Sequence, residues 1–200
     1  MNRVILAYSQ LPGQLPGQLP GSTPRARQQA ESSLGVALAC RLLSAVSERS
    51  IVPGALRYSA HGKPYVPGLP EFSIAHEGGW VLCAVASSGA VGVDVEPLVA
   101  RSSLPRWRLV FDSSEQAAAR TPRAALAIWT AKEAVLKAAG ATLADVSRVR
   151  VRGRHAEFRG QRWHCRTPQF APRMLARLAT AEPVTSLQLR AVPASQTLAP

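Results

Sequence analysis

The sequence predicts an α+β fold, because each half of the chain combines one long helical segment with several short strands. In the first half, apolar residues recur at four-residue spacing and predict a helix over residues 24–47: Leu34, Leu38, Leu42 and Val46. In the second half, Thr121-Pro122 favours the start of a helix and Gly140 favours its end. The 200 residues, 46% of them hydrophobic, suffice to bury a core in one domain or two small ones.

The other elements follow from local composition. An initial strand is predicted over residues 3–8, and the repeat LPGQLPGQLPG at residues 11–21 predicts an extended or turning linker, because it is rich in Pro and Gly. Ser113 begins a second helical zone ahead of the helix that ends at Gly140. Seven further segments have strand composition: residues 72–75, 80–86, 91–95, 149–152, 162–166, 174–179 and 187–192.

Charge and cysteine content narrow the classes of partner and the compartment. The chain carries 24 Lys and Arg against 12 Asp and Glu, a formal charge of +12. Such a field attracts nucleic acid, an acidic membrane face, an acidic protein or a phosphorylated small molecule. No segment resembles a signal-peptide core or approaches the ~20 apolar residues of a membrane span. We expect a cytoplasmic protein, since the three scattered cysteines suggest neither disulfides nor a metal site: Cys40, Cys83 and Cys165.

The segment VGVDVEP, residues 91–97, carries two acidic side chains in a predicted strand. Because side chains alternate along a strand, Asp94 and Glu96 point to one face and the valines to the other. Taken alone, the pattern is typical of a half-buried strand with an acidic face. A hard cation bridging the two carboxylates would turn their repulsion into binding, as Mg²⁺ does beside phosphate oxygens.

The segment WTAKEAVLKAAG, residues 129–140, adds a third carboxylate on a predicted helix. Glu133 and Lys137 lie four residues apart on one stripe, with Lys132 beside them. An exposed pair of this kind contributes only roughly 0.2–0.5 kcal/mol and is common. In combination with Asp94 and Glu96, however, Glu133 offers a metal ligand or a base next to two cationic donors for phosphate oxygens.

A lysine and a histidine lie further upstream, in the segments HGKPY at residues 61–65 and FSIAHE at residues 72–77. A lone histidine such as His76 at a strand end is more often a structural hydrogen-bonding residue than a ligand. The four histidines show no zinc-binding spacing, which argues against a zinc site.

These segments, in this order, resemble the Sfp-type 4′-phosphopantetheinyl transferases. The resemblance rests on VGVDVEP, WTAKEAVLKAAG, the GKP at residues 62–64 and the FSIAH at residues 72–76. It implies two similar halves related by a pseudo-twofold, residues 1–100 and 101–200, each with a long helix on a small, mostly antiparallel sheet. The active site would lie between them, and a monomer is expected because one chain completes it.

The resemblance also implies the reaction, which is transfer of 4′-phosphopantetheine from coenzyme A to a serine of an acyl or peptidyl carrier protein, with release of adenosine 3′,5′-bisphosphate. Carrier proteins are typically acidic and would suit the basic charge. Neither nucleic acid nor a membrane is then an expected partner. The residues that would hold Mg²⁺ on the diphosphate are Asp94, Glu96 and Glu133.

The remaining roles implied by the resemblance concern phosphate and the serine proton. Lys132 and Lys137 would neutralise phosphate charge, with Lys137 in direct contact. The serine proton would go to Glu133 or to a water at the metal ion. Lys63 and His76 would hold the 3′-phosphate of coenzyme A. Glu115 would line the site.

Two alternatives stay open. Ala75 and Glu77 flank His76 where the family usually has hydroxyl residues, which would suit a homologue that binds coenzyme A but has weak activity. Alternating arginines would suit a basic nucleic-acid-binding protein: Arg148, Arg150, Arg152 and Arg154. Against the second alternative, aromatic residues are only 6% of the chain and no known nucleic-acid-binding motif is present.

Overall fold

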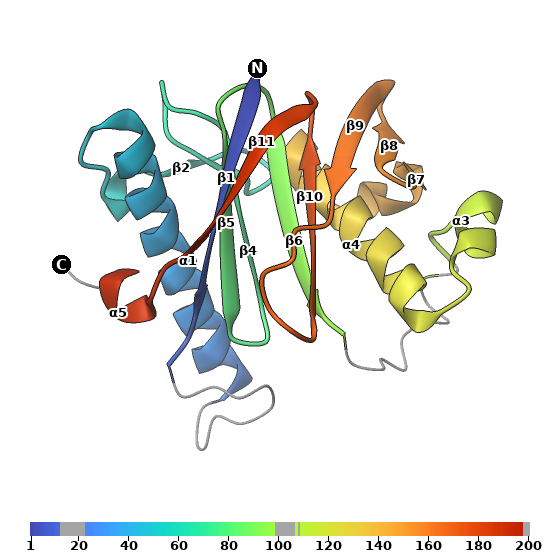
Figure 1. Cartoon of the computed structure of the whole chain (residues 1–200), viewed down its shortest axis with the longest axis horizontal. Helices are drawn as coiled ribbons and strands as arrows, with labels where there is room; N and C mark the ends of the chain where they lie inside the picture. The colour runs from blue at the N-terminus through green and yellow to red at the C-terminus, as the bar shows by residue number, and fades with distance from the viewer. Residues whose placement is uncertain (13–22, 99–106, 108, 198–200) are drawn as a thin grey trace.

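The computed structural model describes residues 1–12, 23–98, 107 and 109–197, which form four layers (Figure 1). Helix α1 (Pro24–Ser47) covers one sheet and helix α4 (Pro122–Ala139) covers another, and the two sheets pack face to face between the helices. The mixed α+β prediction is therefore confirmed. Most of the LPGQ repeat lies outside the described residues.

The first sheet has four strands in the order β11-β1-β5-β4. Its strands are β1 (Asn2–Gln10), β4 (Phe72–Glu77), β5 (Trp80–Ala86) and β11 (Val184–Ala191). Strand β1 runs antiparallel to β5 and parallel to β11. Helix α1 packs its leucine stripe on this sheet, and the hydroxyl of Thr23 caps the helix by accepting a hydrogen bond from the Ala26 amide.

The second sheet has five strands in the order β6-β10-β9-β8-β7. Its strands are β6 (Val91–Pro97), β7 (Arg150–Arg152), β8 (His155–Phe158), β9 (Gln161–Arg166) and β10 (Met174–Thr180). Helix α4 covers one face. It begins after the Thr121 cap and ends at Gly140, whose φ of 62° is the left-handed conformation that favours glycine. Both predicted ends of this helix are confirmed.

The two sheets exchange strands between the halves of the sequence. Strand β6 comes from residues before 100 but belongs to the second sheet, while β11 comes from the far end of the chain and completes the first sheet. Neither sheet is therefore built from one sequence half alone. The pseudo-twofold relation between two similar halves stays a prediction.

The smaller elements lie around this framework. They are η1 (Pro53–Ala55), β2 (Arg57–Tyr58), β3 (Pro64–Tyr65), α3 (Ser113–Ala118), η2 (Leu143–Arg148) and α5 (Ala194–Thr197). Helix α3 begins with a capping box, in which Asp112 and Glu115 each accept a hydrogen bond from the other's backbone amide. The β2–β3 hairpin and β8 were not predicted, because their few residues show no extended run of β-branched side chains.

Alternation along β6 sets the direction of the acidic residues. Val91, Val93 and Val95 are buried between the two sheets, so Gly92, Asp94 and Glu96 turn toward α4. This arrangement places both carboxylates in the layer between β6 and the helix that carries Glu133.

Helix α1 is, among the described residues, a helix long and apolar enough by composition to cross a membrane, which the sequence analysis did not anticipate. The core helix of a globular domain has the same composition. In this structure 44% of its apolar stretch is buried, and the helix packs on β4 and β5. That packing accounts for the apolar residues on the buried side of the helix.

Candidate functional site

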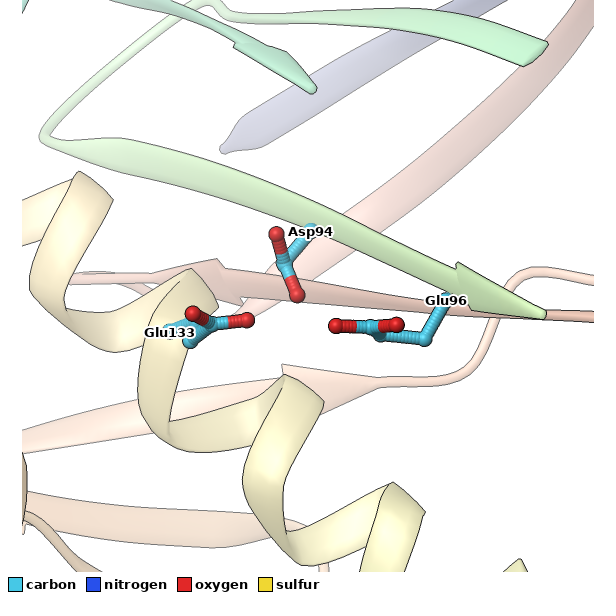
Figure 2. Close-up of side chains that lie close together, drawn as sticks. All are labelled: Asp94, Glu96 and Glu133. Atoms are coloured by element: carbon cyan, nitrogen blue, oxygen red, sulfur yellow. The ribbon is translucent and has the colours of Figure 1, made fainter. Parts of the chain in front are cut away.

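Three carboxylates meet between β6 and α4. Asp94 and Glu96 project from β6 and Glu133 projects from α4, and one oxygen of each lies within 4.8 Å of the others (Figure 2). Asp94 and Glu96 are only 6% and 8% exposed. We call these three residues the carboxylate cluster. The structure thus brings together the three residues predicted to hold a metal ion.

Gly92 determines how closely α4 approaches β6. A Cβ atom at this position would lie 2.0 Å from the Ala134 carbonyl oxygen and 2.4 Å from the Ala138 nitrogen. Both are backbone atoms of α4, so no side-chain rotation would relieve the overlap. Glycine therefore lets the helix backbone lie directly on the strand, one turn from Glu133 and two residues from Asp94.

The carboxylates of the cluster repel one another when they are ionised. Burial, followed by the charge of Asp94 and a hydrogen bond with it, raises the pKa of Glu133 to about 9. Lys137 opposes this, since its Nζ lies 2.7 Å from Asp94 Oδ1. Burial lowers the pKa of Lys137, but Asp94, Glu133 and Glu96 together raise it above the ordinary lysine value.

The donor set fits a hard divalent cation. Carboxylate oxygens are the protein ligands that Mg²⁺ prefers, and three carboxylates converge here, two of them buried and Glu133 partly buried. Without a metal, protonation of Glu133 reduces the negative charge of the cluster. A bound divalent cation would offset the charges of all three carboxylates, so Glu133 would no longer need its proton. Binding of the metal should therefore release a proton and strengthen as the pH rises.

We predict that the metal-free protein becomes less stable as the pH rises from about 7 to about 8.5. With a folded pKa near 9 against an ordinary value of 4.5, Glu133 keeps its proton in the folded state while the unfolded chain has lost it. The unfolded state then binds fewer protons, so stability falls with rising pH. A thermal-unfolding series in a chelating buffer should show the midpoint dropping by roughly a few °C.

The variant Glu133→Gln isolates this effect, because it removes the titrating group and keeps the shape. Its midpoint should change much less over the same pH range. Added Mg²⁺ should raise the midpoint of the parent protein more at the higher pH than at the lower. Parallel slopes for the parent and Glu133→Gln would show that Glu133 is not the group that titrates.

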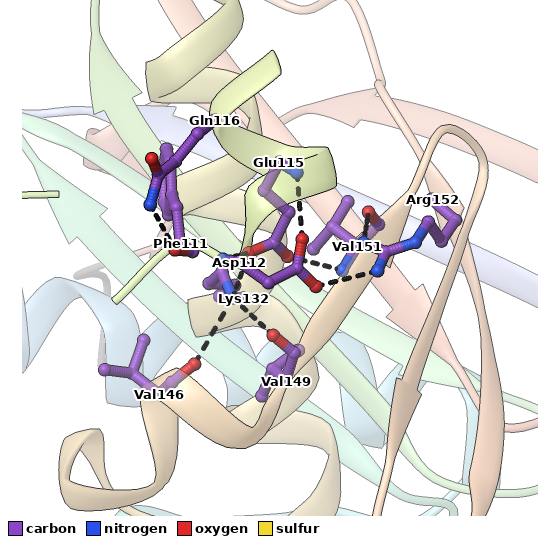
Figure 3. Close-up of polar contacts among 9 residues, drawn as sticks. All are labelled: Phe111, Asp112, Glu115, Gln116, Lys132, Val146, Val149, Val151 and Arg152. Carbon is purple, nitrogen blue, oxygen red and sulfur yellow. Dashed lines mark hydrogen bonds and ion pairs between the residues drawn. The ribbon is translucent and has the colours of Figure 1, made fainter. Parts of the chain in front are cut away.

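Lys132 lies outside the carboxylate cluster. It is fully buried, and its Nζ lies 2.8 Å from Glu115 Oε2 (Figure 3). The ammonium also donates hydrogen bonds to the carbonyl oxygens of Val146 and Val149. The structure therefore does not bring Lys132 or Glu115 to the carboxylate cluster, although both were predicted as site residues, and it leaves Lys132 no exposed surface for a phosphate.

The Lys132–Glu115 pair joins three segments of the C-terminal half. Glu115 Oε1 accepts from the Val151 amide at 2.7 Å and Oε2 accepts from the Asp112 amide at 2.9 Å. Burial lowers the pKa of Lys132, while Glu115 opposes that shift. The pair thus ties α3, α4 and β7 together, which is a structural role.

Lys63 and His76 are not brought together. The ammonium of Lys63 bonds to Glu71 and, at 2.8 Å, to the carbonyl oxygen of Ala138 in the last turn of α4. Glu71 directly precedes β4, whereas His76 lies near the other end of that strand. Five residues of extended chain separate them by about 16 Å. A phosphate group at one end of β4 is about this far from the other end. The predicted shared phosphate site would therefore need long side chains to span the distance between Lys63 and His76.

His76 instead contacts two residues of α1 that the sequence did not reveal. Its Nδ1 lies 3.2 Å from Glu31 Oε2, and its Nε2 lies 3.3 Å from Ser32 Oγ. Glu31 also accepts from the Gly79 amide at 2.7 Å. Ser32 thus supplies a hydroxyl beside the imidazole from a different element, where Ala75 and Glu77 supply none. No local signal could have found this, because the contact depends on how α1 packs on β4.

Comparisons with known proteins agree with this geometry. The family model described as the 4′-phosphopantetheinyl transferase superfamily matches residues 90–185, a segment that includes the whole carboxylate cluster. A curated protein named 4′-phosphopantetheinyl transferase, from Bacillus subtilis, is 48% identical over 40 residues. That alignment covers 19% of this chain and 17% of the relative. Both matches point the same way, and residues 90–185 of the chain are similar to the 4′-phosphopantetheinyl transferase superfamily.

Proposed function

We propose that the protein transfers 4′-phosphopantetheine from coenzyme A to a serine of an acyl or peptidyl carrier protein. The serine oxygen forms a bond to the phosphorus that bears pantetheine, the bond from that phosphorus to the bridging oxygen of the diphosphate breaks, and adenosine 3′,5′-bisphosphate leaves. The serine proton passes to a base. The observation that carries this proposal is the buried carboxylate cluster with Lys137 beside it, in the segment that matches the superfamily.

The carboxylate cluster would hold Mg²⁺ through Asp94, Glu96 and Glu133. When bound, the ion neutralises the diphosphate and stabilises the charge that develops on the leaving group. The chain itself supplies a rigid support for these ligands, since two of them are on strand β6 and the third is on a helix packed directly against it.

Lys137 would bind the phosphate oxygens directly. Its side chain is 39% exposed, so the ammonium next to Asp94 is also within reach of a ligand in solvent. The ammonium can donate three hydrogen bonds, of which Asp94 Oδ1 takes one. The base is Glu133 or a water beside the cluster.

His76 and Ser32 would contact the 3′-phosphate of coenzyme A. The formal charge of +12 supports an acidic carrier protein as the partner, because opposite charge accelerates encounter. One chain supplies every residue named here, so we infer that a monomer suffices for the reaction. We further propose that the reaction takes place in the cytoplasm, because the three scattered cysteines suggest no disulfides.

The test is intact-mass spectrometry of an apo carrier protein incubated with this protein, coenzyme A and Mg²⁺. We expect the carrier to gain one phosphopantetheinyl group on its serine. The Glu133→Gln variant should lose at least roughly a hundredfold in initial rate, since even residues that only support a metal ligand cost up to that much. Its fold should be retained, because Glu133 is protonated in the metal-free protein and Gln has nearly the same shape.

A matched control is Glu48→Gln, the same substitution at an exposed residue after the end of α1. Its rate should equal that of the parent protein. Absence of transfer to several unrelated carriers, with coenzyme A binding measured by calorimetry, would favour the weakly active homologue. Equal rates for the parent and Glu133→Gln would contradict the assigned role of the cluster.

A further inference from the structure

The second sheet has a basic face on the side away from α4. Alternate residues of its outer strands are buried under α4, for example Val151 in β7, Ala156 in β8 and Trp163 in β9. Their neighbours therefore point to the opposite face. That face carries mostly cationic side chains, with one carboxylate among its titratable residues: Arg150, Arg152, His155, Glu157, Arg162, His164 and Arg166.

A hollow of about 440 Å³ lies where this face meets the start of β11. Its walls come from β9, β10, β11 and the turn before β8, and none of the described residues that line it is Asp or Glu. The lining includes three arginines and two histidines: Arg154, Arg166, Arg177, His155 and His164. The volume is within the usual range for small-molecule sites and is larger than a bare inorganic ion needs.

Two of the arginines are held in place by hydrogen bonds to uncharged groups. Arg177 donates from Nε to the Ala127 carbonyl oxygen at 3.1 Å and from Nη1 to Thr167 Oγ1 at 2.7 Å. Arg166 donates from Nη2 to the Val184 carbonyl oxygen at 2.6 Å. A guanidinium has five N–H groups in a fixed plane, so each of these retains donors after its structural bonds are made.

The two histidines add hydrogen-bonding groups to the hollow, and one of their ring nitrogens lacks a partner within the described part of the chain. Their rings lie 5.2 Å apart at 79°, and His155 Nδ1 is buried with no hydrogen-bond partner among the described residues. Burial lowers the pKa of His164, and the neighbouring cations His155, Arg162 and Arg166 lower it further. The surroundings of this imidazole are thus cationic, and an anion in the hollow would remove that penalty.

We propose that this hollow binds the phosphate group of a small phosphorylated molecule, at a site separate from the carboxylate cluster. Planar guanidinium groups match two phosphate oxygens at once, and a tetrahedral dianion can accept from several of them together. Residues of β9, β10 and β11 bound the hollow, and its volume of about 440 Å³ suits a small molecule better than a nucleic-acid strand lying along the sheet. Asp94, Glu96 and Glu133 are not among the described residues that line the hollow, although Arg177 lies opposite Asp94 in the register of β6 and β10 and bonds to α4.

Proton NMR of the imidazole rings in the full-length chain tests the proposal site by site. The chain has four histidines, and only His155 and His164 line the hollow. With sodium sulfate as the probe, the resonances of these two should shift with one saturable dissociation constant, while His61 does not shift. Assignment follows from single His→Gln variants. Shifts confined to His76 would overturn the proposal, because they would place the anion beside α1.

Sulfate remains a dianion across the pH range used, so any change of its affinity with pH reflects protonation of the protein. Binding should be tighter at about pH 6 than at about pH 8, since a bound anion favours the protonated imidazole. Inorganic phosphate, titrated in parallel, distinguishes the two oxyanions. Tighter binding of phosphate than of sulfate at the same pH supports a phosphorylated ligand, and the reverse order overturns that assignment.

Two variants on strand β9 provide a matched pair. Arg166→Gln and Arg162→Gln remove the same charge from the same face of the same strand, but only Arg166 lines the hollow. We expect Arg166→Gln to weaken sulfate binding about tenfold or more and Arg162→Gln to change it little. Arg154→Gln, at an exposed residue of the rim, should also weaken binding. It tests the hollow even if Arg166→Gln does not fold. Equal losses in all three variants would indicate a diffuse basic surface, as in nucleic-acid binding, and would overturn the proposal.

Discussion

Replacing Lys132 by methionine is expected to lower the midpoint of thermal unfolding by roughly 10 °C, because breaking a buried ion pair costs about 3–5 kcal/mol. Lys132 and Glu115 are both fully buried, and the carboxylate would remain in the core without its cation. Circular dichroism during heating, near neutral pH, measures this change. Methionine has a similar length, so packing around α4 should be retained.

Two further variants separate charge from packing. Lys132→Met combined with Glu115→Gln should recover much of the lost stability, since the amide oxygen can still accept from the Val151 amide and no charge stays buried. Arg148→Met, which breaks the exposed pair between Arg148 and Asp145, should cost less than about 1 kcal/mol. If Lys132→Met unfolds at the parent temperature but no longer transfers phosphopantetheine, then Lys132 acts on the substrate and its structural assignment is wrong.

Gly92→Ala is expected to be the most damaging single methyl addition on β6. The new Cβ would lie 2.0 Å from a carbonyl oxygen of α4, so the helix must move away from the strand. Overpacking of a core ordinarily costs about 1–3 kcal/mol, and contact with backbone atoms places this variant at or above the upper end. The displacement would also separate Glu133 from Asp94, so the rise in the unfolding midpoint on adding Mg²⁺ should be smaller than in the parent.

Gly54→Ala is the matched control, because a Cβ there meets no atom within 4 Å. Its unfolding midpoint should equal or slightly exceed that of the parent, since alanine restricts the unfolded chain more than glycine does. Equal midpoints and equal Mg²⁺ responses for Gly92→Ala and the parent would show that α4 does not depend on close contact with β6.

The helices and the longer strands were predictable because their signals are local. Thr121, Pro122 and Gly140 define α4 by hydrogen bonding and backbone conformation within a few residues. The strand exchange was not predictable, because it depends on pairing between residues far apart, such as Asn2 and Val184. Strand β8 is only four residues long and is held in the sheet by its neighbours β7 and β9.

The carboxylate cluster was predictable from period-two alternation in β6, together with the family resemblance that linked it to Glu133. The position of Lys132 was not. Adjacent residues on a helix differ in direction by about 100°, so Lys132 and Glu133 face different surroundings. Which of the two reaches solvent is decided by Glu115 and by the carbonyl groups of Val146 and Val149, which come from other segments. The contact of Ser32 with His76 likewise arises only when α1 packs on the first sheet.

The strand exchange also has a consequence for how the chain acquires its structure during synthesis. Strand β1 is translated well before its parallel neighbour β11, which emerges only after the whole second sheet has been translated. Until then β1 presents an unpaired edge, which is the kind of edge that pairs with other chains and promotes aggregation. Contacts between residues so distant in sequence also slow folding. The nascent chain therefore depends on β11 to close an edge that has been open since β1 was translated.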